Sequence, residues 1–458
     1  MKHLDRWQAN AGKGRKPSKD EVLVIGKSPT PTASTWRLPP SKSHLIRWAL
    51  VAAQSEEVTT LLGTKGAGDD ALAMARCLTQ LGVQIEVDEN SWTVQGVGQF
   101  GFTRPHTLLN CGNSGTTLRL LTGLCARFSF PVMLDGDNTL RHRGNDALWS
   151  ALQECGVELS FGKGAETLPL IMRGPWHPTT LQISTSDSSQ PLSAIRLGAI
   201  GAKQPFSIKL GDYSVSRRHL ELSDQIARKS GSNDSLNLND DDNITLSPWK
   251  PNIASQITIP ADASHAAFAL LFTKLHNVSL TIPNMPEDED CLGHEILSVE
   301  AGSLGLSWDS SADKIKISSV PDAEKYVKID LRDANDLITP LSSLLAISGG
   351  GKIVGASHAA NKESNRITKT VELLAAFGIS CSHDADGIEV SGGQFPSQPA
   401  KVVNCHNDHR LQMSAVILAS AVGGVIRGSN LHEVSYPNFL EAISKSGISY
   451  EKRVQSIE

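Results

Sequence analysis

The stretch PSKSHLIRWALVAA, residues 40–53, joins a short polar turn to a run of small and apolar residues. A helix that is apolar nearly all round is normally buried on every side, so this stretch predicts an internal helix with a polar N-terminal turn. The same combination recurs five more times along the chain, at intervals of 71 to 75 residues. The equivalent polar positions are Ser43, Ser114, Ser189, Ser264, Asp336 and Asp408.

A second pattern has nearly the same period: a helix-like stretch, a glycine and an alternating, strand-like stretch, as in ARCLTQLGVQIEV at 75–87. A glycine in this place is typical of a helix C-terminal cap that leads into a strand. The six glycines are Gly82, Gly156, Gly231, Gly305, Gly378 and Gly447. Solenoid repeats span about 20 to 50 residues, so these longer units, each with two helices and several strands, favour a few compact α/β modules.

Several polar turns carry a lysine or arginine near the predicted helix start, where a positive charge is unfavourable by about 0.3–1 kcal/mol. Each turn alone could hold a plain N-cap. Helix N-termini that cluster form an anion site, because their N–H groups are free and their partial charge is positive. Together the cations predict a site for phosphate and carboxylate groups. They are Lys42, Arg47, Arg119 and Arg410 in the polar turns, and Arg143, Lys362 and Arg366 in two loops.

Length and composition exclude several other classes of protein. The chain has 458 residues, 43 Lys+Arg and 48 Asp+Glu, which gives a net charge of −5. A nucleic-acid-binding protein would need a basic face, and a membrane span would need roughly 20 apolar residues in a row; we expect neither partner. The seven cysteines are odd in number and form no CxxC pair, which argues against a disulfide framework or a zinc site and favours a reducing compartment.

Residues 1–20 are basic but contain no apolar segment of the kind that a secretory signal requires. We expect them to be a flexible tail. The expected location is the cytoplasm, or a plastid if this extension is a transit peptide.

Eight motifs in fixed order now identify a resemblance. They are PSKSHLIR (40–47), GNSGTTLR (112–119), the loop ending at Arg143, SSQ (188–190), DAS (262–264), the segment around Asp336, NKESNR (361–366) and NDHR (407–410). The chain resembles the 5-enolpyruvylshikimate-3-phosphate (EPSP) synthases, a family of enolpyruvyl transferases. GNSGTTLR and KESNR are fairly specific for this family.

The resemblance implies an α/β fold: a two-domain inside-out α/β barrel of six β-α-β-α-β-β repeats, three per domain, around buried parallel helices. The expected shikimate-phosphate-binding domain spans 41–259. The second domain would combine 1–40 with 260–458 and carry the phosphoenolpyruvate-binding loops. The Asn- and Asp-rich stretch 232–252 is expected to be an exposed excursion before the second crossing.

The resemblance also implies a reaction. These enzymes join the enolpyruvyl group of phosphoenolpyruvate to the 5-hydroxyl of shikimate 3-phosphate, release phosphate, and serve aromatic amino acid biosynthesis. The route is addition to a tetrahedral intermediate followed by elimination, and it requires no metal or other cofactor. The expected partners are therefore these two small molecules, and the expected oligomeric state is a monomer.

Site residues are carried over from the matching motifs. The expected catalytic residues are Asp336, which would take the 5-hydroxyl proton, and Glu363 with Lys42, which would handle the proton at C3. The expected phosphoenolpyruvate ligands are Lys42, Asn113, Gly115, Arg143, Arg366 and Arg410. The expected shikimate 3-phosphate ligands are Ser43, Arg47, Ser188, Ser189, Ser216, Asp336 and Lys362, and Gln190 would bridge both substrates. Arg119 and Asp70 are expected to support loops.

Five positions depart from the pattern that the family usually shows, and two of them, Asn335 and Gly144, stand where proline is common. Val434 stands where a lysine commonly contacts phosphoenolpyruvate, His219 where a tyrosine is usual, and His358 where an asparagine is usual. The departures leave open a paralogue that acts on another hydroxylated cyclic acid. A UDP-amino-sugar enolpyruvyl transferase is a weaker alternative, since most carry a cysteine on the loop that here reads DGDNTLRHR. An inactive binding module would be expected to lack the acids that are present.

Overall fold

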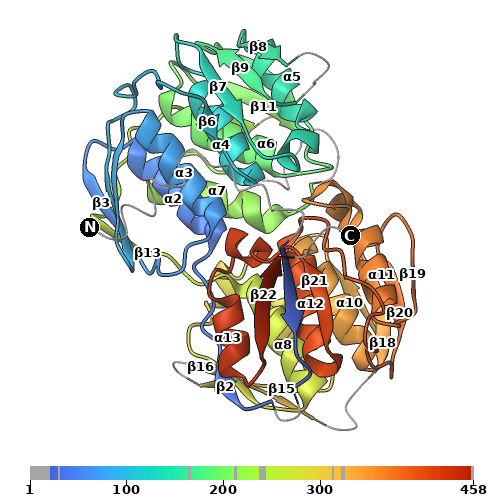
Figure 1. Cartoon of the computed structure of the whole chain (residues 1–458). Coiled ribbons are helices and arrows are strands. Elements are labelled where there is room, and N and C mark those ends of the chain that lie inside the picture. The colour runs from blue at the N-terminus through green and yellow to red at the C-terminus, as the bar shows by residue number, and fades with distance from the viewer. Residues whose placement is uncertain are drawn as a thin grey trace. The chain divides into compact units, whose positions relative to one another are not determined.

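The computed structural model describes residues 21–28, 31–162, 167–210, 214–236, 244–311, 314–320 and 325–454. The predicted tail, 1–20, lies outside this part of the chain. The chain divides into two compact units (Figure 1). We call Pro40–Pro260 the middle unit. The outer unit combines Met1–Pro39 with Ala261–Glu458.

The helices of the middle unit are α2 (Lys42–Ala53), α3 (Asp69–Gln80), α4 (Gly115–Cys125), α5 (Asp146–Glu154), α6 (Gln190–Gly198) and α7 (Arg217–Lys229). Its strands are β3 (Val58–Leu62), β4 (Gln84–Val87), β5 (Ser91–Gln95), β6 (Leu109–Asn110), β7 (Val132–Asp135), β8 (Glu158–Phe161), β9 (Leu170–Arg173), β10 (Thr180–Ile183), β11 (Phe206–Leu210), β12 (Ile244–Leu246) and β13 (Gln256–Thr258).

The helices of the outer unit are α8 (Ala266–His276), α9 (Ile296–Glu300), α10 (Ile338–Ile347), α11 (Arg366–Ala376), α12 (His409–Val422) and α13 (Phe439–Lys445). Short 3₁₀ turns include η3 (Ala263–His265), η5 (Asn335–Leu337), η6 (Ser357–Asn361) and η7 (Leu431–Val434). The strands are β1 (Glu21–Ile25), β2 (Ser34–Thr35), β14 (Leu280–Ile282), β15 (Leu306–Ser311), β16 (Lys314–Ser319), β17 (Val327–Asp330), β18 (Gly350–Val354), β19 (Cys381–His383), β20 (Ile388–Ser391), β21 (Gly424–Arg427) and β22 (Tyr450–Val454).

The sheets repeat one topology. Four of them have the orders β13-β3-β5-β4, β6-β7-β9-β8, β2-β14-β16-β15 and β17-β18-β20-β19, and in each the first pair is parallel and the others are antiparallel. The remaining sheets of the described residues are β10-β11-β12 and β21-β1-β22. The described strands therefore form separate sheets, three in each unit, and not one continuous closed barrel.

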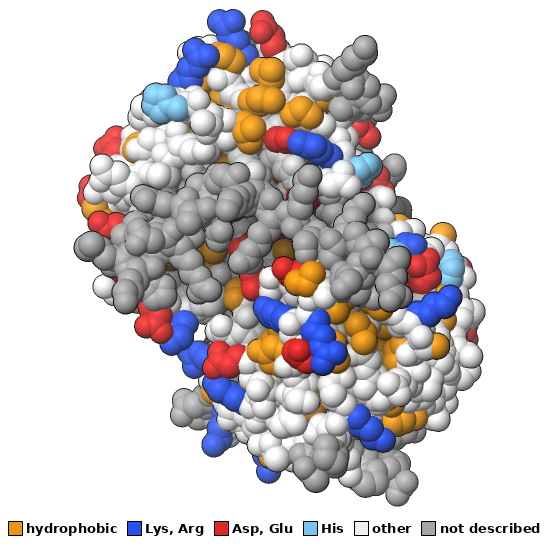
Figure 2. Space-filling model, in the orientation of Figure 1, with side chains coloured by type: hydrophobic (Ala, Val, Ile, Leu, Met, Phe, Trp, Pro, Cys, Tyr) orange, Lys and Arg blue, Asp and Glu red, His pale blue; other side chains and the backbone are white. Residues whose placement is uncertain are grey.

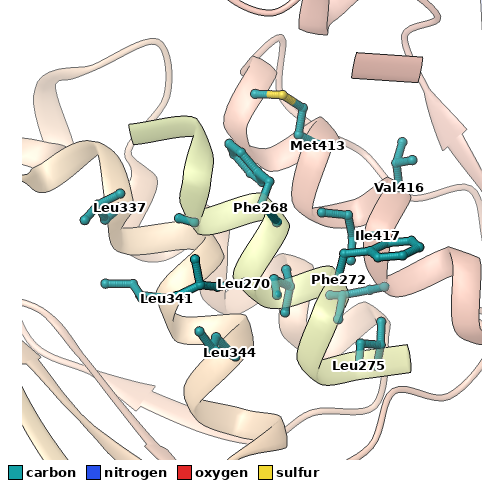
Figure 3. Close-up of a cluster of buried hydrophobic side chains, with 14 of the residues drawn as sticks. Phe268, Leu270, Phe272, Leu275, Leu337, Leu341, Leu344, Met413, Val416 and Ile417 are labelled. Carbon is teal, nitrogen blue, oxygen red and sulfur yellow. The ribbon is translucent and has the colours of Figure 1, made fainter. Parts of the chain in front are cut away.

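The core of the outer unit lies between three helices that the sequence marks as apolar all round. Helices α8, α10 and α12 contact one another, and each also packs against strands of its own sheet. Figure 3 shows Phe268 and Phe272 of α8 in the same cluster as Leu341 of α10 and Ile417 of α12. All four side chains are fully or almost fully buried. Helices inside and sheets outside are the arrangement that an inside-out barrel requires.

The predicted glycine caps are confirmed. All six glycines have positive φ, between +71° and +106°, and each follows the end of a helix or helical turn. Residues with a side chain are strained at such angles, whereas glycine is not. The six glycines thus end six helical segments in the same way.

The expectation of an exposed excursion at 232–252 is wrong for part of that stretch. Ile244 to Leu246 form strand β12, which pairs with β11, and both of these residues are buried together with Trp249. In this short edge strand the two apolar side chains face inward and Thr245 between them is exposed. Residues 237–243 lie outside the described part of the chain.

Lysines and arginines are interspersed with acidic residues on the described surface that Figure 2 shows, and they form no continuous basic face there. No helix in the described part of the chain has the length and hydropathy to cross a membrane.

A buried ion pair fastens α6 to α7 in the middle unit. Arg196 is completely buried, and its Nε donates to Asp224 Oδ1 at 2.9 Å. Its Nη2 donates to Ser232 Oγ at 3.1 Å, and its guanidinium carbon lies 5.0 Å from the Trp249 ring centroid. A buried charge that loses its counter-charge is strongly destabilising.

We therefore predict that Asp224→Asn lowers the free energy of unfolding by about 3–5 kcal/mol. Urea denaturation of the full chain measures this loss. The matched control is Glu56→Gln, which breaks an exposed pair with Lys250 and should change stability by less than about 1 kcal/mol. Equal effects of the two substitutions would contradict this reading of the buried pair.

Candidate active site

The first turn of α2 places Lys42 against the first turn of α3. Lys42 Nζ donates to Asp70 Oδ2 at 2.8 Å, and the two side chains are only 17% and 6% exposed. Ser41 is the N-cap of α2. A lysine at the first position of a helix is unfavourable on its own, so the Asp70 carboxylate offsets its charge. Asp70 therefore has the supporting role that the sequence predicts.

Arg47, one turn further along α2, is buried and makes its hydrogen bonds within the middle unit. Its Nε donates to Ser223 Oγ at 2.7 Å, its Nη1 to the carbonyl of Ser43 at 3.0 Å, and its Nη2 to the carbonyl of His219 at 3.2 Å. Burial lowers the pKa of Arg47 to about 10, which leaves the guanidinium charged at neutral pH. Arg47 thus fixes α7 against α2.

The turn before α4 gathers three of the predicted ligands. Asn113 Oδ1 accepts from Arg143 Nη2 at 3.0 Å, and Ser114 caps the helix by accepting from the Thr117 amide. Gly115 is the first residue of α4. A Cβ atom on Gly115 would lie 2.9 Å from Arg119 Nη1 and 3.3 Å from Arg143 Nη1. The absence of a side chain at Gly115 therefore leaves room for two guanidinium groups at one helix N-terminus.

The start of α6 lies beside the same group. The Gln190 carboxamide accepts from Arg119 Nη1 at 2.5 Å and donates to Thr116 Oγ1 at 3.1 Å. Ser188 Oγ accepts from the Gln190 amide at 3.2 Å. Ser189 occupies the N-cap position without making a side-chain cap bond, and its buried hydroxyl has no partner among the described residues. A buried hydroxyl at a helix N-terminus is available to an incoming anion.

Ser216 precedes α7 in the left-handed conformation, with φ +54° and ψ +43°. Few residues other than glycine adopt these angles, and they cluster where a fold must aim a side chain or an amide. Ser216 is close in sequence to His219, whose carbonyl accepts from Arg47. The start of α7 is therefore joined to α2 through the Arg47 side chain.

In the outer unit, three carboxylates surround Arg366 at the start of α11. The guanidinium donates to Asp408 at 2.8 Å, to Asp336 at 2.6 Å and to Glu363 at 2.5 Å. Arg366 is 1% exposed and Asp408 is completely buried. Burial alone would lower the pKa of Arg366, but Asp408, Glu363 and Asp336 outweigh it and raise the pKa above its ordinary value.

Arg410, in the first turn of α12, shares the Asp336 carboxylate. Its Nη2 donates to Asp336 Oδ2 at 3.1 Å and to Ser264 Oγ at 2.9 Å. Asp336 is therefore held by two buried arginines, one at each oxygen. Asp336 lies within η5, whereas Ala334 and Leu337 occupy the N-cap positions of η5 and α10, so Asp336 is not the plain N-cap that the sequence left open.

A tight turn aims Asp408 at both arginines. His406 and Asn407 have φ of +49° and +58°, and the Asp408 amide donates to the carbonyl of Cys405 at 2.8 Å. Asp408 then caps α12 by accepting from the Arg410 amide at 2.9 Å while it accepts from Arg366. One carboxylate thus sets the positions of two cations.

Lys362 and His358 complete this side of the outer unit. Lys362 is half-buried in extended conformation directly before Glu363. His358, in η6, is 3% exposed, and its ring nitrogens have no hydrogen-bond partner among the described residues. Burial lowers the pKa of His358 to about 3, and the charge of Lys362 acts in the same direction. His358 is therefore neutral at physiological pH.

Within each unit the predicted residues converge on helix starts. In the outer unit, acid–base groups lie against buried cations, an arrangement that suits proton transfer beside a bound anion. A sequence model of the family described as EPSP synthase (3-phosphoshikimate 1-carboxyvinyltransferase) matches residues 27–443. The chain belongs to the EPSP synthase family.

Curated relatives agree with this family. The 3-phosphoshikimate 1-carboxyvinyltransferase of Streptococcus agalactiae is 31% identical over 428 residues, which cover 89% of this chain and 95% of that protein. The enzyme of the same name from Methanosphaera stadtmanae is 28% identical over 416 residues, with the same coverage. The predicted family is confirmed, and it is a family of transferases.

Solved structures confirm the fold class. EPSP synthase from Acinetobacter baumannii superposes with a TM-score of 0.73 at 24% identity and covers 95% of this chain and 100% of that one. The enolpyruvyl transferase NikO from Streptomyces tendae superposes equally well at 14% identity, covering 96% and 100%. The fold is therefore that of the enolpyruvyl transferases.

Two features of this EPSP synthase family member escaped sequence reasoning. Ser264, one of the six equivalent polar positions of the repeat, is a direct hydrogen-bond partner of Arg410. Asp262 and His265 lie next to it and extend the network. The DAS motif indicates only the local cap, in which Asp262 accepts from the Ser264 amide. No local pattern reports the contact with Arg410, which lies 146 residues further along the chain.

The buried neutral state of His358 predicts an acid-sensitive stability. An unfolded histidine has a pKa near 6.5, so between pH 6.5 and about 3 the unfolded chain binds a proton that the folded chain does not. Stability then falls as pH is lowered, by up to about 1.4 kcal/mol per pH unit. We predict that His358→Gln loses up to about 2 kcal/mol less between pH 6.5 and pH 5 than the wild type does. Urea denaturation at both values tests this, and parallel losses would contradict it.

Proposed function

We propose that this chain transfers the enolpyruvyl group of phosphoenolpyruvate to the 5-hydroxyl of shikimate 3-phosphate, with the residues of the two units in the roles given below. The observation that carries the assignment of roles is the position of Asp336 against Arg366 and Arg410. A base held beside two buried cations suits a reaction in which a hydroxyl loses its proton next to an anion.

In the addition step, Asp336 takes the proton of the 5-hydroxyl while the hydroxyl oxygen bonds to C2 of phosphoenolpyruvate. C3 gains a proton, for which Glu363 and Lys42 are the candidates, and a tetrahedral intermediate results. In the elimination step, C3 returns its proton to the group that supplied it, and the C–O bond to phosphate breaks with its electron pair on the phosphate oxygen. That oxygen takes the proton held by Asp336, so phosphate leaves and the starting protonation states are restored. Glu363 lies 2.5 Å from Arg366 and its side chain is 8% exposed, so the guanidinium favours the carboxylate form, which suits Glu363 as the acceptor of the proton that C3 returns.

Cations of both units serve the anionic groups. In the outer unit, Arg366 and Arg410 hold phosphoenolpyruvate and Lys362 takes the shikimate phosphate. In the middle unit, Lys42, Arg143 and the Asn113–Gly115 turn act on phosphoenolpyruvate. Ser188, Ser189 and Ser216 bind the shikimate phosphate, Ser43 and Arg47 the shikimate moiety, and Gln190 bridges the substrates. The buried hydroxyl of Ser189 supports its role, because a phosphate oxygen would supply the bond that it lacks.

The substrate assignment is preferred over its alternatives. The loop that ends at Arg143 has no cysteine, and the hydroxyl of Thr139 in this loop accepts a hydrogen bond from Arg143 Nη2. Asp336, Glu363 and Lys42 are all present, as an active enzyme requires. We further propose that the enzyme is a monomer in a reducing compartment such as the cytoplasm. The seven free cysteines support the reducing compartment.

The direct test is phosphate release from phosphoenolpyruvate with shikimate 3-phosphate as acceptor and UDP-N-acetylglucosamine as control acceptor. We expect release with the first alone. Lys42→Ala should reduce turnover by about 10²-fold or more, because a proton-transfer group contributes typically 10²–10⁴-fold. Release with neither acceptor, or with the UDP sugar alone, would contradict the proposal. Undiminished turnover in Lys42→Ala would remove this residue from the mechanism.

The space at Gly115 gives a second test. Gly115→Ala places a methyl group 2.9 Å from Arg119 Nη1, so the guanidinium groups beside it must shift. We expect the Michaelis constant for phosphoenolpyruvate to rise by about tenfold, equivalent to roughly 1.4 kcal/mol of binding. Gly144→Ala is the matched control, because a Cβ there meets nothing within 4 Å. An unchanged constant in Gly115→Ala would mean that the turn does not bind this substrate.

A further inference from the structure

A buried row of side chains in the outer unit joins the start of α8 to the loop after η7. Asp262 Oδ1 lies 3.5 Å from His265 Nδ1, and His265 Nε2 lies 3.0 Å from Ser435 Oγ. His265 is completely buried and Ser435 is 4% exposed. The His265 ring also stands edge-on to Tyr436, with centroids 5.2 Å apart.

The order Asp–His–Ser is that of a hydrolytic triad, but burial excludes that role. A nucleophilic serine must meet a substrate, and neither Ser435 nor His265 presents a surface that a substrate could reach. The row is also more than core packing, because both ring nitrogens of His265 lie within contact distance of a polar partner. The row therefore holds the Asp262 carboxylate and the Ser435 loop in fixed positions.

The other end of the row leads to the proposed active site. Asp262 Oδ1 accepts from Ser264 Oγ at 2.5 Å and from the Ser264 amide at 3.1 Å. A hydroxyl has one hydrogen, so Ser264, having given it to Asp262, offers its lone pairs to Arg410 Nη2 at 2.9 Å. The same Nη2 donates to Asp336. The direction of the Ser264 hydroxyl thus depends on a carboxylate that His265 contacts.

The near end of the row is next to Val434 in the chain. Ser435 follows it directly at the end of η7, and the preceding His432 is anchored separately, its amide donating to Gln412 Oε1 at 2.7 Å. His265 Nδ1 also lies 3.4 Å from Ser264 Oγ, so His265 joins the loop after η7 both to Ser264 and to the carboxylate that orients it.

We propose that His265 is a positioning residue for the transferase reaction: it orients the Asp262 carboxylate, and through Ser264 the Arg410 guanidinium, and ties both to Ser435, the residue that follows Val434. This inference rests on the proposed function, in which Arg410 binds phosphoenolpyruvate. His265 itself touches neither substrate. Its loss should therefore weaken binding of phosphoenolpyruvate more than it slows chemistry.

The test compares steady-state kinetics of the full chain carrying His265→Ala, His265→Gln or His276→Ala. His276 is the matched control: it ends the same helix, bonds to Ser420 Oγ at 2.7 Å and packs on Phe272, and among the described residues it contacts none of Asp262, His265 and Ser435. We expect His265→Ala to raise the Michaelis constant for phosphoenolpyruvate about tenfold, the effect of roughly 1.4 kcal/mol, with a change of less than about threefold in kcat.

His265→Gln, which retains an amide donor and acceptor, should restore most of the affinity, whereas His276→Ala should leave the Michaelis constant unchanged. A wild-type constant in His265→Ala, or an equal rise in His276→Ala, would overturn the proposal. If His265→Ala does not fold, Ser435→Ala decides: a raised constant supports the proposal and an unchanged one overturns it. A wild-type chain inactive with shikimate 3-phosphate would instead refute the proposed function.

Discussion

The structure depends on placing two arginines where a folded protein can least easily hold them, at buried helix N-termini. Arg366 and Arg410 are each 1% exposed and lie in the first turns of α11 and α12. Removing a charge from water costs several kcal/mol unless it is paired, and the helix dipole opposes a cation at this end. Asp408 and Asp336 offset both penalties. The cap, the left-handed turn before it and the ion pairs are consequences of that one requirement.

The same constraint explains why the acids and cations are inseparable in this site. Asp336 stabilises the arginines when no substrate is bound, and an anionic substrate would take over part of that work. A base held this way is oriented before the substrate arrives, which avoids reorganisation during the reaction. In the middle unit, Asp70 plays the corresponding part for Lys42, and Gln190 with the Gly144 carbonyl for Arg119.

Much of the fold follows from local sequence rules. The glycines from Gly82 to Gly447 mark helix ends by a backbone angle that other residues avoid, and the apolar runs mark the inner helices. The family's roles for Asp336, Glu363, Arg366 and Arg410 could be inferred from motifs, and the structure brings these four together. Strand β12 was missed because three residues beside an Asn- and Asp-rich run carry little periodicity. The Asp262–His265–Ser435 row was missed because 170 residues separate His265 from Ser435, and no local pattern reports such a contact.

The most direct measurement is a crystal structure of the chain with phosphoenolpyruvate and shikimate 3-phosphate, or with an unreactive analogue of either. The account predicts that phosphoenolpyruvate accepts hydrogen bonds from the guanidinium groups of Arg366 and Arg410, and that a phosphate oxygen accepts one from the Ser189 hydroxyl. Ligands bound elsewhere, with these arginines still satisfied by carboxylates alone, would show that the buried cations serve the fold and not the reaction.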